Sequence, residues 1–232
     1  DEFGGHYMDQ FTYAERATDW RSNNNIAESI FEQMRLERYP VPSWLISSAG
    51  TGGTVATLGR YVRYRARPTR VCAADPERSV FFDHYVSRAP GLCLQEGSRI
   101  EGIGRPRVAA SFLPAVIDAM VQVPDVWSIA TMYELSARLG RTVGASTGTN
   151  LLATLACMAQ MRANGEAGSV VTLLCDSGQR YGHTYYSEDW LERAGLSCPQ
   201  ERAAVAATLD SGEIAEALSA SWRIAGDLAS AP

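Results

Sequence analysis

The sequence contains no lysine, because all 21 of its basic residues are arginine. A reaction that needs a side-chain primary amine, such as Schiff-base formation, has no group here to carry it. Histidine is also scarce, with three residues spread from His6 to His183. We therefore expect neither a catalytic lysine nor a metal site among these residues.

Cysteine is sparse and scattered: there are five residues, and no two are spaced as CxxC. This pattern argues against a disulfide framework or a structural zinc site and favours a reducing, cytoplasmic location. Long apolar runs are absent as well, and residues 1–11 lack the basic and apolar regions of a signal peptide. We expect no membrane partner.

Charge gives little indication of a partner. The formal charge of −5 is interspersed along 232 residues, and arginine is locally enriched only over residues 60–70. A nucleic-acid surface would need aromatic platforms or a known binding module, and neither is present. We interpret the arginines as a solvated helix face and expect no nucleic-acid partner.

Strand and helix patterns alternate along the chain. This alternation predicts an α/β fold, with a mainly parallel twisted sheet between helices in three αβα layers and ligands at the carboxyl ends of the strands. The region 76–117, rich in glycine and proline, is expected to be irregular and to fold over a site. Asp125 is expected to cap a helix. Strands are predicted at 44–48, 70–74, 118–123 and 169–175, the last covered on both faces, and helices at 54–64, 126–139, 151–162, 201–209 and 213–225.

A glycine-rich loop separates the first predicted strand from its helix. Its residues are Gly50, Thr51, Gly52, Gly53 and Thr54. Backbone amides in such a loop can converge on an anion at a helix N-terminus, and the threonine hydroxyls add donors. The spacing matches neither a dinucleotide nor a nucleoside triphosphate loop, so a single phosphate is favoured. An ordinary tight turn is the alternative interpretation.

Small residues recur at 146–150, where a second turn is expected before a helix. Ser146 suits a helix N-cap, since serine is preferred there. Cys175 ends an apolar run and is interpreted as an inert core thiol rather than a nucleophile. Asp176 follows it directly and is placed to reach a ligand or to brace the strand end.

Five ordered motifs, covering roughly residues 8–185, resemble the cysteine synthase and cystathionine β-synthase family of pyridoxal-phosphate enzymes, which has the tryptophan-synthase-like fold. The chain looks most like an actinobacterial branch that includes cysteine desulfhydrases and cysteine synthases. The motifs are Asp9-Gln10-Phe11, the glycine-rich loop, Ile100-Glu101-Gly102-Ile103-Gly104, Gly144-Ala145-Ser146-Thr147-Gly148 and Asp176-Ser177-Gly178-Gln179-Arg180-Tyr181.

The resemblance implies roles for these residues. The loop from Gly50 to Thr54 would hold the phosphate of pyridoxal phosphate, and Ser146 would bond the pyridine nitrogen. A neutral hydroxyl there leaves the ring a weaker electron sink, which favours β-elimination or β-replacement over transamination. Gln10 would help bind the substrate carboxylate, and Gly102 with Ile103 would form a closing lid.

The family's lysine-bearing N-terminal region has no counterpart here. We expect the C-terminal part of a longer homodimeric enzyme that acts on cysteine or an O-activated serine. Residues 1–11 would be the tail of a small domain, 12–195 the large cofactor domain and 196–232 a helical appendage. The alternative is a lysine-less, non-catalytic binding module.

Overall fold

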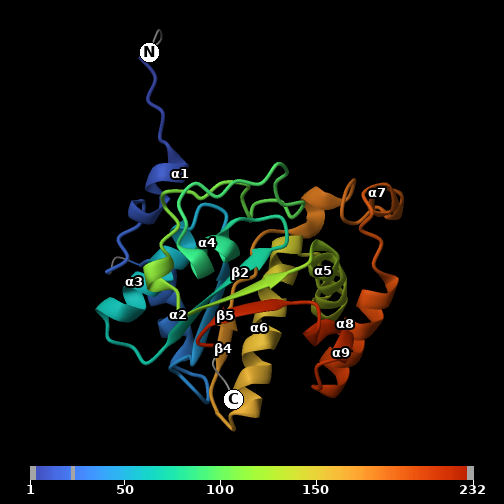
Figure 1. Ribbon diagram of the computed structural model, residues 1–232. Helices are drawn as coiled ribbons and strands as arrows, with labels where there is room; N and C mark the ends of the chain where they lie inside the picture. Colours follow the sequence, from blue (N-terminus) through green and yellow to red (C-terminus); the bar gives the residue numbers. More distant parts are fainter. Residues whose placement is uncertain (1–3, 22–23, 229–232) are drawn as a thin grey trace.

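The computed structural model describes residues 4–21 and 24–228, which build a five-stranded sheet with helices on both faces (Figure 1). The strand order is β4-β1-β2-β3-β5, and all pairs are parallel except the antiparallel pair of β3 with β5. The fold is therefore the expected α/β sandwich with a mainly parallel sheet. The strands are β1 (Trp44–Ser48), β2 (Arg70–Pro76), β3 (Ala119–Val123), β4 (Val170–Thr172) and β5 (Arg223–Gly226).

The helices form the two outer layers. Leu45 of β1 packs in one hydrophobic cluster with residues of α2, α3 and α4, whereas its neighbour Ile46 packs in another with α5, α6 and α8. This alternation follows from the two-residue period of a strand. The helices are α1 (Gln10–Tyr13), α2 (Ile26–Met34), α3 (Gly53–Tyr64), α4 (Phe81–Ser87), α5 (Asp125–Leu139), α6 (Ala145–Ala163), α7 (Glu188–Arg193), α8 (Pro199–Ser211) and α9 (Glu216–Ser219), with 3-10 turns η1 (Ala14–Arg16), η2 (Pro114–Val116) and η3 (Gly178–Tyr181).

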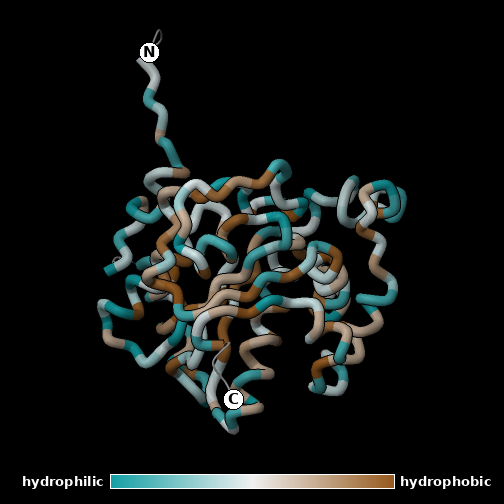
Figure 2. Tube along the Cα trace, in the orientation of Figure 1, coloured by the Kyte–Doolittle hydropathy of each residue, from teal (hydrophilic) through white to brown (hydrophobic). Residues whose placement is uncertain are grey.

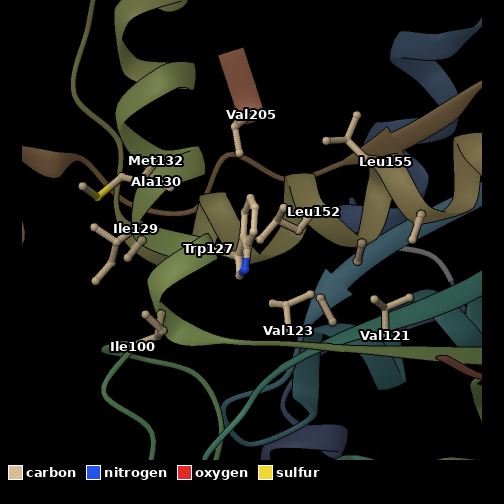
Figure 3. Close-up of a cluster of buried hydrophobic side chains, with 14 of the residues drawn as sticks. Ile100, Val121, Val123, Trp127, Ile129, Ala130, Met132, Leu152, Leu155 and Val205 are labelled. Carbon is tan, nitrogen blue, oxygen red and sulfur yellow. The ribbon is translucent and has the colours of Figure 1, made fainter. Parts of the chain in front are cut away.

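The larger cluster fills the space between the sheet and helices α5, α6 and α8. Trp127 of α5 lies between Val123 of β3 and Leu152 of α6, and all three are buried (Figure 3). Apolar residues run along the central strands, while the outer loops carry a mixture of hydrophilic and hydrophobic residues (Figure 2). Burial of this apolar surface is the main term that stabilises the three layers.

Several predicted elements are confirmed. β1 has the predicted bounds, and α3 begins one residue before the predicted helix. β2 runs two residues past its predicted end, and α5 begins at Asp125 itself. Asp125 is not the cap: Pro124 takes that position, and the Asp125 carboxylate accepts from Arg99 Nε at 2.9 Å instead.

The predicted turn at residues 146–150 is wrong, because these residues belong to a helix. α6 begins at Ala145 with Gly144 as its N-cap, so Ser146 lies inside the first helical turn and does not cap it. The small residues that suggested a turn let α6 pack closely on α5. A Cβ on Gly148 would lie 2.0 Å from the Ser128 carbonyl oxygen.

The last predicted parallel strand is shorter and less covered than expected. β4 spans Val170–Thr172, and each of its residues is half-buried. In the described structure β4 pairs only with β1, so it is an edge strand. An apolar run does not distinguish a central strand from an edge strand whose flank is open.

The predicted helix over 213–225 is wrong for most of its length. Only α9 is helical, and β5 then pairs with β3, for example Ile224 opposite Val121. Leu218 and Leu228 are buried in the larger hydrophobic cluster. Sheet pairing and burial outweigh the high intrinsic helix propensity of this alanine-rich sequence. The predicted appendage, 196–232, is therefore not purely helical. Its predicted helix at 201–209 is confirmed and is longer at both ends, since α8 spans Pro199–Ser211.

The region 76–117 is mostly irregular, as predicted, but it also contains α4 and η2. Its chain is anchored to the rest of the molecule. Arg99 bonds Asp125 of α5, and Ser111 Oγ donates to the carbonyl of Phe11 at 2.9 Å. The region is therefore held against the carboxyl ends of the strands.

The interpretation of the arginines of residues 60–70 as a solvated helix face is incomplete, because several of them bond other parts of the chain. Arg63 Nη2 lies 2.8 Å from Asp118 Oδ1, and Arg70 Nη2 lies 2.5 Å from Glu166 Oε1. Arg60 donates to the carbonyl of Glu15 at 2.7 Å. These contacts join α3 and β2 to neighbouring segments.

No helix in residues 4–21 or 24–228 combines the length and apolar composition needed to cross a membrane.

A buried carboxyl group makes stability depend on pH. Asp75 of β2 is fully buried, and its Oδ2 accepts a hydrogen bond from Phe82 N at 2.9 Å. Burial outweighs this bond and raises the pKa of Asp75 from 3.8 to about 7. The folded state thus holds a proton that the unfolded chain has lost, so the group costs stability increasingly as pH rises from 4 to 7.

We expect Asp75→Asn to remove this part of the pH dependence, which is on the order of a few kcal/mol at roughly 1.4 kcal/mol per pKa unit. Urea denaturation between pH 4 and 8 measures it, and the advantage of the variant should grow up to about pH 7. Asp189→Asn, at an exposed position on α7, is the control. A constant difference between Asp75→Asn and the parent across this range would contradict the assignment.

Candidate functional site

A cavity of about 610 Å³ lies at the carboxyl ends of β1 and β4. Its walls come from the loop after β1, the first turn of α6, the segment after β4 and the loop 101–105. This is where a parallel sheet with helices on both faces is expected to bind ligands. Its size is in the range of sites for small molecules.

Most of the residues predicted from sequence meet in this cavity. Gly52 and Gly53 do not line it, although they belong to the same loop; they shape the turn behind it. The predicted residues in its wall are Gln10, Gly50, Thr51, Thr54, Gly102, Ile103, Ser146 and Asp176.

The glycine-rich loop needs glycine for two different reasons. A Cβ on Gly50 would lie 2.2 Å from the Gly102 carbonyl oxygen, so the two loops could not approach each other. Gly52 has φ +95°, and its Cβ would lie 2.7 Å from the Phe112 Cα. Both positions exclude a side chain, which fixes the course of the loop into α3.

Polar groups with spare hydrogen-bonding capacity face the cavity from this loop. The first N–H groups of α3 have no partner within the helix, and they carry the positive end of its dipole. Thr54 is exposed at that end, and Thr51 lies beside it. Ser48 is a largely buried residue of the cavity wall, and its hydroxyl has no hydrogen-bond partner in the described part of the chain. This arrangement suits an anion.

The first turn of α6 forms the opposite wall. Ser146 is buried at the second position of the helix, where its hydroxyl contacts the Cys175 thiol. One turn further, Asn150 Oδ1 accepts from Ser48 N at 2.7 Å, and its Nδ2 donates to Leu173 O at 3.2 Å. Asn150 thereby fixes the ends of β1 and β4 relative to α6.

Asp176 leads from β4 into the far wall. Its Oδ2 accepts from the Tyr181 hydroxyl at 2.6 Å, whereas its buried Oδ1 has no partner among the described residues. Burial and this hydrogen bond raise the pKa of Tyr181 above its ordinary value, so the phenol stays protonated and donates. Arg180 lies at the rim, 3.9 Å from Asp176 and 3.7 Å from Glu101.

Gln10 and the loop 101–105 close the remaining side. Gln10 is exposed at the start of α1, while Ile103 is buried. Gly104 N donates to Ala49 O at 2.8 Å and Glu101 N to the Tyr185 hydroxyl at 2.8 Å, so the loop is anchored at both ends. Its movement as a lid stays a prediction.

Cys175 is not the core thiol that the sequence suggested. It is exposed and lines the cavity, because β4 ends before it. Its backbone N donates to Thr147 Oγ1 at 3.0 Å. Desolvation raises the pKa of the Cys175 thiol, which favours the protonated form at neutral pH. Its low reactivity stays a prediction.

Sequence reasoning did not identify the polar residues that position the site. Asn150, Thr147 and Ser48 belong to small-residue stretches that were interpreted as turn or strand. The available signal was a set of polar residues at helical spacing in a segment with few charges, which predicts buried hydrogen bonds. No group of three or more metal-binding side chains occurs within residues 4–21 and 24–228.

Comparison with known proteins agrees with this architecture. The model of the pyridoxal-phosphate dependent enzyme family matches residues 1–176. The crystal structure of O-ureido-L-serine synthase superposes with a TM-score of 0.61 at 23% identity, covering 82% of this chain and 58% of that one. At that identity the likeness concerns the fold.

Curated relatives are similar in sequence over most of the chain. L-cysteine desulfhydrase Cds1 of Mycobacterium tuberculosis is 59% identical over 195 residues, which are 84% of this chain and 53% of the relative. Cysteine synthase 2 of Schizosaccharomyces pombe is 28% identical, over 83% of this chain and 49% of the relative. The chain spans about half the length of these relatives. It belongs to the family of pyridoxal-phosphate dependent enzymes.

Proposed function

We propose that this chain supplies the cofactor-binding part of a pyridoxal-phosphate enzyme of cysteine metabolism. The observation that carries the proposal is the cavity, in which the glycine-rich loop and Ser146 line one space at the ends of the strands. A ligand with a phosphate at one end and a polar ring at the other fits such a site. Pyridoxal phosphate has this chemistry.

The residues present fit the cofactor. The loop amides and the N-terminus of α3, with the Thr51 and Thr54 hydroxyls, would hold the phosphate. The unpartnered Ser48 hydroxyl offers one more donor in the same cavity. Gly50, Gly52 and Gly53 allow the backbone to take this course. Asp176 braces the far wall through Tyr181. Gln10 also lines the cavity and would help bind the substrate carboxylate.

Ser146 sets the electronic character of the site. When bound, the cofactor withdraws electrons from the Cα bonds of an amino acid. The Ser146 hydroxyl is neutral and lies in the first turn of α6, where the helix dipole disfavours added positive charge. A pyridine nitrogen there would stay largely unprotonated, which favours loss of a β-substituent over transamination.

The preferred reaction is β-elimination, in which cysteine and water yield pyruvate, ammonia and sulfide. Its support is the 59% identity with a protein named as an L-cysteine desulfhydrase. The second candidate is β-replacement, in which O-acetylserine and sulfide yield cysteine and acetate. It is supported by relatives named as cysteine synthases, including one of Emericella nidulans at 34% identity over 64% of this chain.

The 232 residues contain no lysine, so we infer that the amine that anchors the cofactor comes from another segment. The domain division at residues 11 and 195, homodimer formation and a cytoplasmic location stay part of this proposal. The absence of lysine is also what favours the alternative, a non-catalytic module that binds the cofactor or its phosphate.

The phosphate end of the site can be tested without catalysis. We expect Gly52→Ala to weaken binding of inorganic phosphate, measured by calorimetry, because the new methyl group would displace the loop from Phe112. Gly91→Ala is the matched control: Gly91 also has a positive φ, but nothing lies within 4 Å of its Cβ position. If Gly52→Ala and Gly91→Ala bound phosphate with equal affinity, the anion would not bind at the glycine-rich loop.

The reaction is tested on the protein at its natural length with pyridoxal phosphate. Incubation with cysteine is expected to release pyruvate and sulfide, while O-acetylserine plus sulfide tests for cysteine. If the protein bound the cofactor but catalysed neither reaction, the proposed enzyme activity would be refuted and the non-catalytic binding module would be favoured.

A further inference from the structure

Cys175 lines the cavity and is fixed against α6. Its backbone N donates to Thr147 Oγ1 at 3.0 Å, and its sulfur accepts from Asn150 Nδ2 at 3.3 Å. The thiol in turn donates weakly to the Leu173 carbonyl oxygen, 3.9 Å from the sulfur. Because these contacts act from three directions, the sulfur keeps one position beside the first two turns of α6.

The fixed sulfur is the partner of the Ser146 hydroxyl. Ser146 is buried, and its hydroxyl contacts the Cys175 thiol. In the described part of the chain this hydroxyl makes no other hydrogen bond. Sulfur is a weak acceptor, so the hydroxyl is held in place but loses little energy when it turns to a better acceptor. The Ser146 hydroxyl is therefore oriented without being committed.

The neighbouring carboxylate does not compete for this hydroxyl. Asp176 Oδ2 accepts from the Tyr181 hydroxyl at 2.6 Å, and its Oδ1 is packed against Gly144, where a Cβ would lie 2.0 Å away. A carboxylate would hold the Ser146 hydroxyl more firmly than a thiol, since hydrogen bonds to ionised acceptors are stronger than those to neutral ones. Among the described residues, Ser146 thus meets only the weak acceptor.

We propose that Cys175 positions the Ser146 hydroxyl for the ring nitrogen of the cofactor, because its sulfur orients this hydroxyl and releases it when the ring binds. Cys175 would act through Ser146 and take no part in proton transfer or nucleophilic attack. This inference rests on the proposed function, since it takes the cavity to hold pyridoxal phosphate with its ring beside α6. An oxygen acceptor at residue 175 would instead retain the hydroxyl.

The test uses the natural-length protein and pyridoxal phosphate carrying an NMR-active isotope at its ring nitrogen, whose resonance reports hydrogen bonding at that atom. Cys175→Ser places a stronger acceptor in a side chain of similar size. We expect its resonance to shift toward that of Ser146→Ala and its Kd for the cofactor to rise about fivefold, which is the loss of one hydrogen bond. Cys175→Ala removes the acceptor and should raise the Kd about twofold at most. Cys93→Ser, at an exposed thiol outside the cavity, is the matched control and should change neither quantity.

The order of the variants separates positioning from packing. If Cys175 only filled space, alanine would leave the larger void and weaken cofactor binding more than serine, and that order would overturn the inference. In a Ser146→Ala background, neither substitution at Cys175 should change the Kd or the resonance further, because the hydroxyl on which they act is gone. Additive effects in that background would also overturn it.

The outcomes distinguish this inference from the proposed function. A parent protein that binds no cofactor would refute both. A parent that binds the cofactor, with the same resonance in Cys175→Ser as in the parent, would refute the positioning role alone. The expected shifts without turnover of cysteine would support the positioning role and refute only the proposed reaction.

Discussion

The close contact between the Gly102 carbonyl and the Cα of Gly50 is the constraint on which the site depends. Any side chain at Gly50 would meet that oxygen at 2.2 Å. The contact stacks the loop 101–105 on the loop after β1, and Gly104 N then bonds Ala49 O. It thereby brings segments more than fifty residues apart into one wall and sets Arg105 next to the start of α3.

A second set of interactions fixes the opposite wall. Asn150 and Thr147 of α6 bond the backbone at Ser48, Leu173 and Cys175, so the ends of β1 and β4 cannot shift independently of the helix. β4 itself pairs only with β1 in the described structure, and its three residues are half-buried. Side-chain hydrogen bonds from α6 therefore compensate for the weak pairing at this edge of the sheet.

Local patterns were sufficient for the elements that determine the fold class. β1, α3 and α5 follow from apolar periodicity and glycine position, and eight of the predicted residues line one cavity. The failures have non-local causes. β5 forms in an alanine-rich stretch because β3 offers it a partner, and Cys175 is exposed because β4 ends early.

Protection of Cys175 tests the central claim, that this cavity binds pyridoxal phosphate. Cys175 lines the cavity, whereas Cys93 is exposed outside it. Alkylation of the natural-length protein at mildly alkaline pH, followed by peptide mass spectrometry, compares the two thiols with and without cofactor. The account predicts that the cofactor slows modification of Cys175 in a saturable manner and leaves Cys93 unchanged. An unchanged rate at Cys175 with cofactor bound would contradict it.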